Sequence, residues 1–131
     1  MSRDASIGPL PWADGKYTFR LGWGELATLQ EKTDCGPLYL LERLAGKHWR
    51  VNDISHTIRL GLIGGGLEPA AALKLVETYV ESRPPMENVM MAYAIIAAGV
   101  QGAPDEKPKK PRGRRKATGL TTSPTESGAS A

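Results

Sequence analysis

The chain has 131 residues, room for one small domain, and its 17 Lys and Arg outnumber its 14 Asp and Glu. The excess lies in residues 104–131, which hold seven basic and three acidic side chains, whereas residues 1–103 hold ten and eleven. One cysteine excludes an internal disulfide, and the longest uncharged apolar run, Val89–Val100, is too short to span a membrane. The start of the chain lacks the pattern of a signal peptide. We therefore expect a soluble, cytoplasmic protein.

A β-hairpin is predicted near the N-terminus, after a flexible leader at residues 1–9. Leu10–Ala13 is expected to form a short first strand, and Asp14-Gly15 suits a tight turn. Lys16–Leu21 then pairs back as a half-buried strand, because apolar and polar residues alternate along it. The inward-facing residues of this strand are Tyr17, Phe19 and Leu21.

From Trp23 the apolar spacing becomes helical, and the chain is predicted to continue as five short helices. The third helix is capped by Asn52 or Asp53 and ended by the glycines at positions 64–66. The expected ranges of the other four are Gly24–Lys32, Pro37–Ala45, Glu68–Ser82 and Pro85–Val100.

The predicted fold class is α+β and mainly α, with the N-terminal hairpin packed on the helices in a domain over residues 10–102. A lone hairpin is marginal in water, so its apolar face must pack on the helices. Residues 103–131 are rich in Pro, Lys and Arg and then in Ser and Thr, and we expect a disordered basic tail there. The side chains expected in the core are Tyr17, Phe19, Leu21, Trp23, Leu26, Ile54, Ile58, Leu62, Val89, Tyr93 and Ile96.

Two strings of sequence are distinctive, DGKYTFRLGWGELATLQEKT at Asp14–Thr33 and TIRLGLIGGG at Thr57–Gly66. In the first, a strand gives way to a helix with only Gly22 as the joint. Together the strings resemble the gene-transfer-agent and phage family of small tail-assembly proteins, and the resemblance runs collinearly from about Ala13 to Gly102. It implies a role in building the tail of a phage, prophage or gene-transfer particle.

Within that role, the resemblance favours a tail assembly chaperone, which binds the tape-measure protein while tube subunits polymerise around it. The partners would then be the tape-measure protein and tail tube subunits, in a bacterial cell that carries a prophage or gene-transfer-agent cluster. Some descriptions of the family instead imply a structural tail tube or tail-completion component. Two predicted strands are few for a subunit of a continuous ring-forming sheet, which favours the chaperone.

No residues stand at the spacing of a catalytic or metal site, so we expect neither an enzyme nor a cofactor. His48 and His56 lie on different predicted elements, and Cys35 lies in a turn without a neighbouring histidine. The glycines at 64–66 suggest a phosphate-binding loop, but they follow a helix and lack the Gly-Lys-Ser/Thr ending. Flexible or left-handed backbone at the helix end is the other interpretation, and the pattern favours it.

The last predicted helix is apolar on two opposite sides. One stripe holds Val89, Tyr93, Ile96 and Val100, and methionines are concentrated along the same segment. A helix that is apolar all round is either the central core helix or a helix with one side left for a partner. On the second interpretation the partner-binding residues are Met86, Met90, Met91, Ile95 and Ala98.

The basic tail contains KPKKPRGRRKA at Lys107–Ala117. Pro111–Arg114 resembles the core of an AT-hook, although Arg115 stands where such hooks usually have proline. A nucleic-acid-binding module is therefore a second alternative function, with weak, salt-sensitive association with polyanions as its simplest form. The residues expected to bind a polyanion are Lys109, Lys110, Arg112, Arg114, Arg115 and Lys116.

Overall fold

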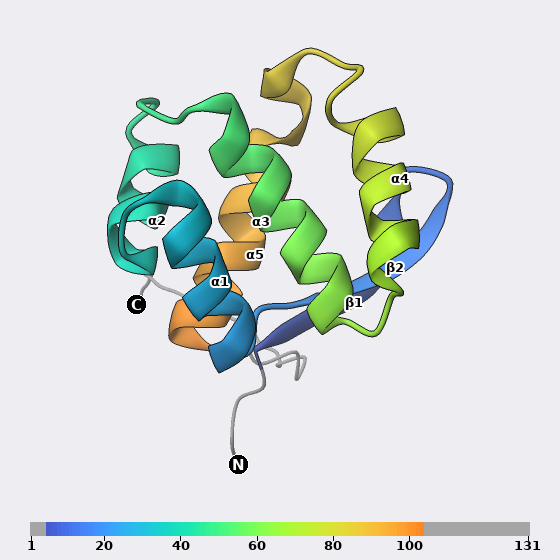
Figure 1. Cartoon of the computed structure of the whole chain (residues 1–131), viewed down its shortest axis with the longest axis horizontal. Helices are drawn as coiled ribbons and strands as arrows, with labels where there is room; N and C mark the ends of the chain where they lie inside the picture. Colours follow the sequence, from blue (N-terminus) through green and yellow to red (C-terminus); the bar gives the residue numbers. More distant parts are fainter. Residues whose placement is uncertain (1–4, 104–131) are drawn as a thin grey trace, which may run out of the picture.

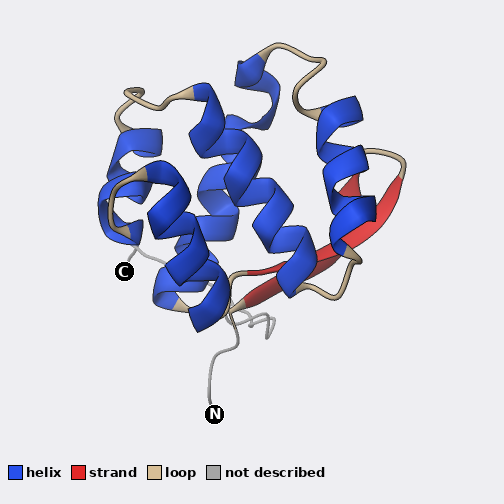
Figure 2. Cartoon of the chain, viewed as in Figure 1, coloured by secondary structure: helices blue, strands red, loops and turns tan. Residues whose placement is uncertain are grey.

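The computed structural model describes residues 5–103 as a hairpin followed by helices, an α+β fold that is mainly α (Figures 1 and 2). The expectations for the leader's first residues and for the basic tail lie outside this range. The elements in chain order are β1 Ser6–Trp12, β2 Gly15–Arg20, α1 Trp23–Thr33, α2 Pro37–Ala45, α3 Val51–Gly64, α4 Pro69–Tyr79, the 3-10 helix η1 Pro85–Asn88 and α5 Val89–Gln101.

The hairpin is longer than the sequence predicts, because β1 begins at Ser6 inside the expected leader. Ile7 pairs with Phe19, and a register shift separates that pair from Leu10 and Tyr17. The pairing therefore extends past a local irregularity that the apolar alternation does not reveal.

The turn of the hairpin also lies one residue earlier than predicted. Trp12 pairs with Gly15, so the two turn residues are Ala13 and Asp14, and the positive φ of 54° falls on Ala13. The Tyr17 hydroxyl donates to the carboxylate of Asp14, which fixes the turn to the second strand.

The central helix is α3, which packs against β2, α1, α4 and α5, and α5 runs behind it in Figure 1. Small residues let α3 and α5 approach their neighbours closely. A Cβ added to Gly61 would lie 3.0 Å from Cγ2 of Ile95, and one added to Gly99 would lie 2.9 Å from Cβ of Leu21. The core therefore joins both halves of the chain around α3 and α5.

The start of α3 is fixed by a buried ion pair. Arg43 on α2 donates to both carboxylate oxygens of Asp53, at 3.1 and 2.9 Å, and both side chains are almost fully buried. Asp53 also accepts the backbone N–H of Arg50 at 2.7 Å. The helix consequently begins at Val51. The sequence predicted Asn52 or Asp53 at the N-cap position, but the N-cap is Arg50, and Asp53 caps the helix from the third position of its first turn.

Asn88 explains why α4 stops at Tyr79 rather than Ser82. Its side-chain N–H donates to the carbonyl of Tyr79 at 3.0 Å, and its carbonyl accepts the indole N–H of Trp12 at the same distance. This buried amide therefore joins the hairpin to the end of α4. The single helix predicted over Pro85–Val100 is instead η1 followed by α5, with Asn88 at their junction.

Candidate functional site and its two apolar grooves

The first groove lies where the end of α2 faces η1 and the start of α5, and we call it the methionine groove. Met90 is 74% exposed and Met86 is similarly open to solvent, both unusually high for methionine. The groove has a volume of about 550 Å³. It is lined by Leu44, Ala45, Lys47, Trp49, Met86, Val89, Met90 and Tyr93.

Only two of the five predicted partner-binding residues belong to this groove, Met86 and Met90. Ile95 is 1% exposed and Ala98 is also buried, while Met91 is half-buried against the core. The prediction that Ile95 and Ala98 face a partner was wrong, because α3 and the hairpin cover that side of α5. These two residues belong to the core, as the alternative interpretation held.

The second groove lies between α1, the start of α2 and the end of α5, and we call it the tryptophan groove. Its volume is about 480 Å³. Trp23, at the first position of α1, is 89% exposed at its rim, and Leu38 is also exposed. The lining residues are Trp23, Leu26, Ala27, Gln30, Pro37, Leu38, Gly99 and Val100.

Trp23 was predicted in the core, and its exposure corrects the phase assigned to α1. The helix buries Leu29 and Thr33, with Leu26 half-buried, so its inner face is turned by about a quarter of a circle from the predicted one. Leu21, just before the helix, is buried instead, against Gly99 of α5. Among the other predicted core residues, Tyr17, Leu26 and Tyr93 are half-buried and the rest are buried.

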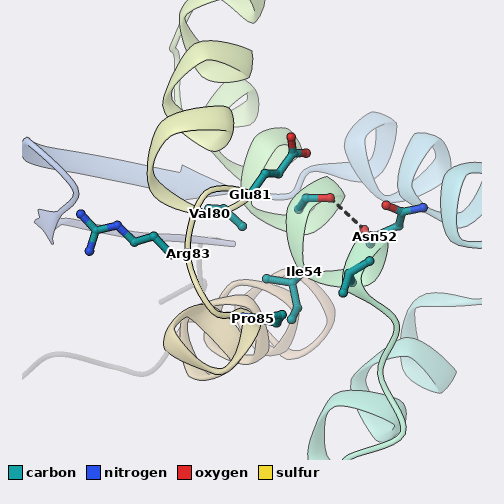
Figure 3. Close-up of a pocket in the computed structure, with 8 residues that line it drawn as sticks. Asn52, Ile54, Val80, Glu81, Arg83 and Pro85 are labelled. Carbon is teal, nitrogen blue, oxygen red and sulfur yellow. Dashed lines mark hydrogen bonds between the residues drawn. The ribbon is translucent and has the colours of Figure 1, made fainter.

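A third hollow, of about 410 Å³, lies between the start of α3 and the segment that follows α4 (Figure 3). Ser55 in its wall donates to the carbonyl of Asn52 at 3.5 Å, within its own helix. Figure 3 shows the Arg83 side chain pointing away from Ile54. A nucleophilic serine is activated by a neighbouring base, but the hydrogen-bond partner of Ser55 in this hollow is a backbone carbonyl of its own helix.

The two histidines and the cysteine do not come together into a site. His56 lies 3.3 Å from a guanidinium nitrogen of Arg59, and burial together with the charges of Arg59 and Lys32 lowers its pKa. Cys35 donates weakly to the hydroxyl of Thr33 at 3.7 Å. Within residues 5–103 no group of three His, Cys, Asp or Glu side chains is placed to hold a metal ion.

The glycines at the end of α3 lie against the backbone of β2. A Cβ on Gly64 would stand 1.9 Å from the carbonyl oxygen of Arg20, and one on Gly65 the same distance from that of Thr18. Of the glycines at 64, 65 and 66, Gly66 alone has a positive φ, 112°. Close approach of two backbones explains the first two glycines, and left-handed backbone explains the third. The glycines are therefore accounted for without a phosphate-binding loop.

The predicted polyanion-binding residues, Lys109 to Lys116, lie outside the described residues. The sequence analysis also missed most of the methionine groove, since Leu44, Lys47 and Trp49 come from another part of the chain. A signal for the tryptophan groove was present. Trp23, Ala27 and Gln30 have helical spacing, and only the side of the helix they face was misassigned.

The fold and the two grooves define a small, mainly helical protein with exposed apolar surface. Residues 9–102, well over half of the chain, match the model of the family described as "Phage tail tube protein, GTA-gp10". The chain belongs to this family of phage and gene-transfer-agent tail proteins. No curated protein and no solved structure matches it. None of the helices in residues 5–103 is long and apolar enough to cross a membrane.

Proposed function

We propose that this tail protein is an assembly chaperone, which holds a helical, apolar segment of the tape-measure protein until tube subunits assemble around it. The observation that carries the proposal is the methionine groove, where Met86 and Met90 stand exposed beside Trp49 and Tyr93. The proposal is one of binding and involves no catalysis.

The shape and lining of the groove suit an amphipathic helix. It is bounded by the end of α2 on one side and by η1 and α5 on the other, as helix-binding grooves commonly are. Methionine side chains are flexible and polarizable, so they adapt to partner side chains of different shape. Lys47 is the one charged residue among the lining residues described, and it offers a cation to a carboxylate at the edge of the partner helix.

The family description also supports a second candidate, a structural component of the tail tube. The hairpin argues against extension into a ring-forming sheet at both of its edges. The end of α3 packs on the outer side of β2 through Gly64 and Gly65, and β1 contains Pro9 and Pro11, which donate no backbone hydrogen bond. These features favour the chaperone over the tube subunit.

The test is co-expression with the cognate tape-measure protein, followed by a solubility measurement and a pull-down. We expect the tape-measure protein to be soluble and retained with the wild-type protein, and Met90→Asp to abolish retention by placing a charge in an apolar interface. Leu73→Asp is the matched control, since Leu73 is an exposed apolar residue of α4 outside both grooves. It should leave retention unchanged.

Two results would contradict the proposal. One is a tape-measure protein that is equally soluble alone and is not retained. The other is incorporation of this protein into finished tails in the copy number of a tube subunit, measured by quantitative mass spectrometry of purified particles, which would establish the structural alternative.

A further inference from the structure

We propose that the tryptophan groove is a dimer interface, in which Trp23 of each copy enters the groove of a second copy of this chain. The starting observation is the exposure of Trp23, the largest side-chain type, which normally buries most of its surface. Two other apolar residues of the same groove, Leu38 and Val100, are also exposed. A contiguous apolar surface of this kind marks an interaction site.

The groove contains both parts of a self-complementary contact. Trp23 projects from the first turn of α1, and the hollow beside it has a volume of about 480 Å³. In an interface with two-fold symmetry, each copy presents the same patch, so a projection and a hollow within one patch fill each other. Tryptophan is also one of the residue types enriched among the residues that contribute most to such contacts.

The polarity of the groove favours a second copy over a charged partner. Two-fold symmetry brings each residue near the axis close to its own equivalent, so a charge there would repel itself. None of the described residues that line the groove is charged, and its one side-chain amide belongs to Gln30. A side-chain amide both donates and accepts hydrogen bonds, so Gln30 can pair with the Gln30 of the second copy.

The dimer leaves the methionine grooves free. Leu38 and Val100 line the tryptophan groove, whereas Leu44 and Met90 line the methionine groove, so the two grooves lie at opposite ends of α2 and α5. The nine residues from Met90 to Gly99 place them about 14 Å apart along α5. Two copies joined at Trp23 therefore present two methionine grooves, which suits a long partner with repeated binding segments.

The test is sedimentation of the full-length chain over a concentration series, with Trp23→Lys and Val100→Lys as interface variants and Met90→Lys as the matched control. We expect a reversible dimer in the wild type, and each interface variant should weaken dimerisation about 30-fold or more, as loss of a central interface residue does. Met90→Lys should leave the dimer intact. All three side chains are exposed, so the variants should fold, which unfolding curves would verify.

Several outcomes would overturn the inference. They are a wild type that stays monomeric at hundreds of micromolar, a dimer insensitive to Trp23→Lys, and a dimer lost with Met90→Lys, which would assign the contact to the methionine groove. Capture of tail tube subunits by the monomer through Trp23 would assign the groove to a different protein. Because the control lies in the methionine groove, this experiment and the tape-measure pull-down can fail independently.

Discussion

The two ends of α3 are held in place by opposite means. At its start, Asp53 is buried with Arg43 and caps the helix through the N–H of Arg50. At its end, Gly64 and Gly65 contribute no side chains, and the helix backbone lies directly on the backbone of β2. One end therefore depends on two charged groups both being present, and the other depends on a methyl group being absent. The same helix should respond to substitution by different mechanisms at its two ends.

The largest effect is expected at the charged end. Arg43→Met removes one partner and leaves the carboxylate of Asp53 buried without its cation, a change that typically costs about 3–5 kcal/mol. The measurement is urea unfolding, with the free energy of unfolding compared between wild type and variant. Arg83→Met is the control, because Arg83 pairs with Glu87 at 3.5 Å on the surface, and such pairs contribute about 0–1 kcal/mol. Equal losses from the two would show that burial does not determine the cost.

The double variant Arg43→Met with Asp53→Leu sharpens this result. Replacing both members of a buried pair with apolar residues is often close to neutral, so it should recover much of the stability lost in the single variant. Asp53 also caps the helix, however, so recovery should be incomplete by about 1 kcal/mol. Full recovery would mean that the capping bond contributes little.

An intermediate effect is expected at the glycine end. Gly64→Ala or Gly65→Ala places a methyl group where the carbonyl of Arg20 or Thr18 stands, and overpacking of this kind typically costs about 1–3 kcal/mol. Gly24→Ala is the matched control, because nothing lies within 4 Å of its added Cβ and the residue is inside α1. That change should stabilise the protein by up to about 1 kcal/mol through helix propensity. A destabilising Gly24→Ala would contradict the assigned cause.

The sequence predicted the second helix to the residue and the order of the two strands and five α-helices, because prolines at helix starts and glycines at helix ends are local signals. It did not predict the phase of α1, because Trp23 and Leu29 are both apolar and only the tertiary packing selects which one faces inward. The same limit explains the error over Ile95 and Ala98. Whether an apolar helix is covered depends on α3 and the hairpin, which lie far away in sequence.

Most of the methionine groove was missed for a related reason. Met86 and Met90 were identified from composition, whereas Leu44, Lys47 and Trp49 reach the groove through the packing of α2 on α5. The role of the glycines at 64 and 65 was also out of reach of the sequence, since a helix end and a close backbone contact both call for glycine. Local sequence signals therefore predicted where the helices and strands lie along the chain, whereas the grooves on the surface depend on how these elements pack against one another.

The smallest effect concerns His56, which lies on α3 between the two contrasted ends. Burial, followed by the positive charges of Arg59 and Lys32, lowers the pKa of His56 from 6.5, and the negative charges of Glu81 and Asp53 only partly oppose this. In the folded protein Arg59 donates to the neutral ring of His56, an arrangement that protonation removes.

Because the folded pKa lies below the unfolded one, the unfolded chain binds the proton more readily, so stability should decrease as pH falls below about 6.5. The loss should level off once the pH is below the folded pKa. His56→Gln should flatten this part of the profile, and His48→Gln, at an exposed position of the α2–α3 loop, is the control. The measurement is urea unfolding between pH 7.5 and pH 5. A profile unchanged by His56→Gln would show that other groups carry the pH dependence of this helix.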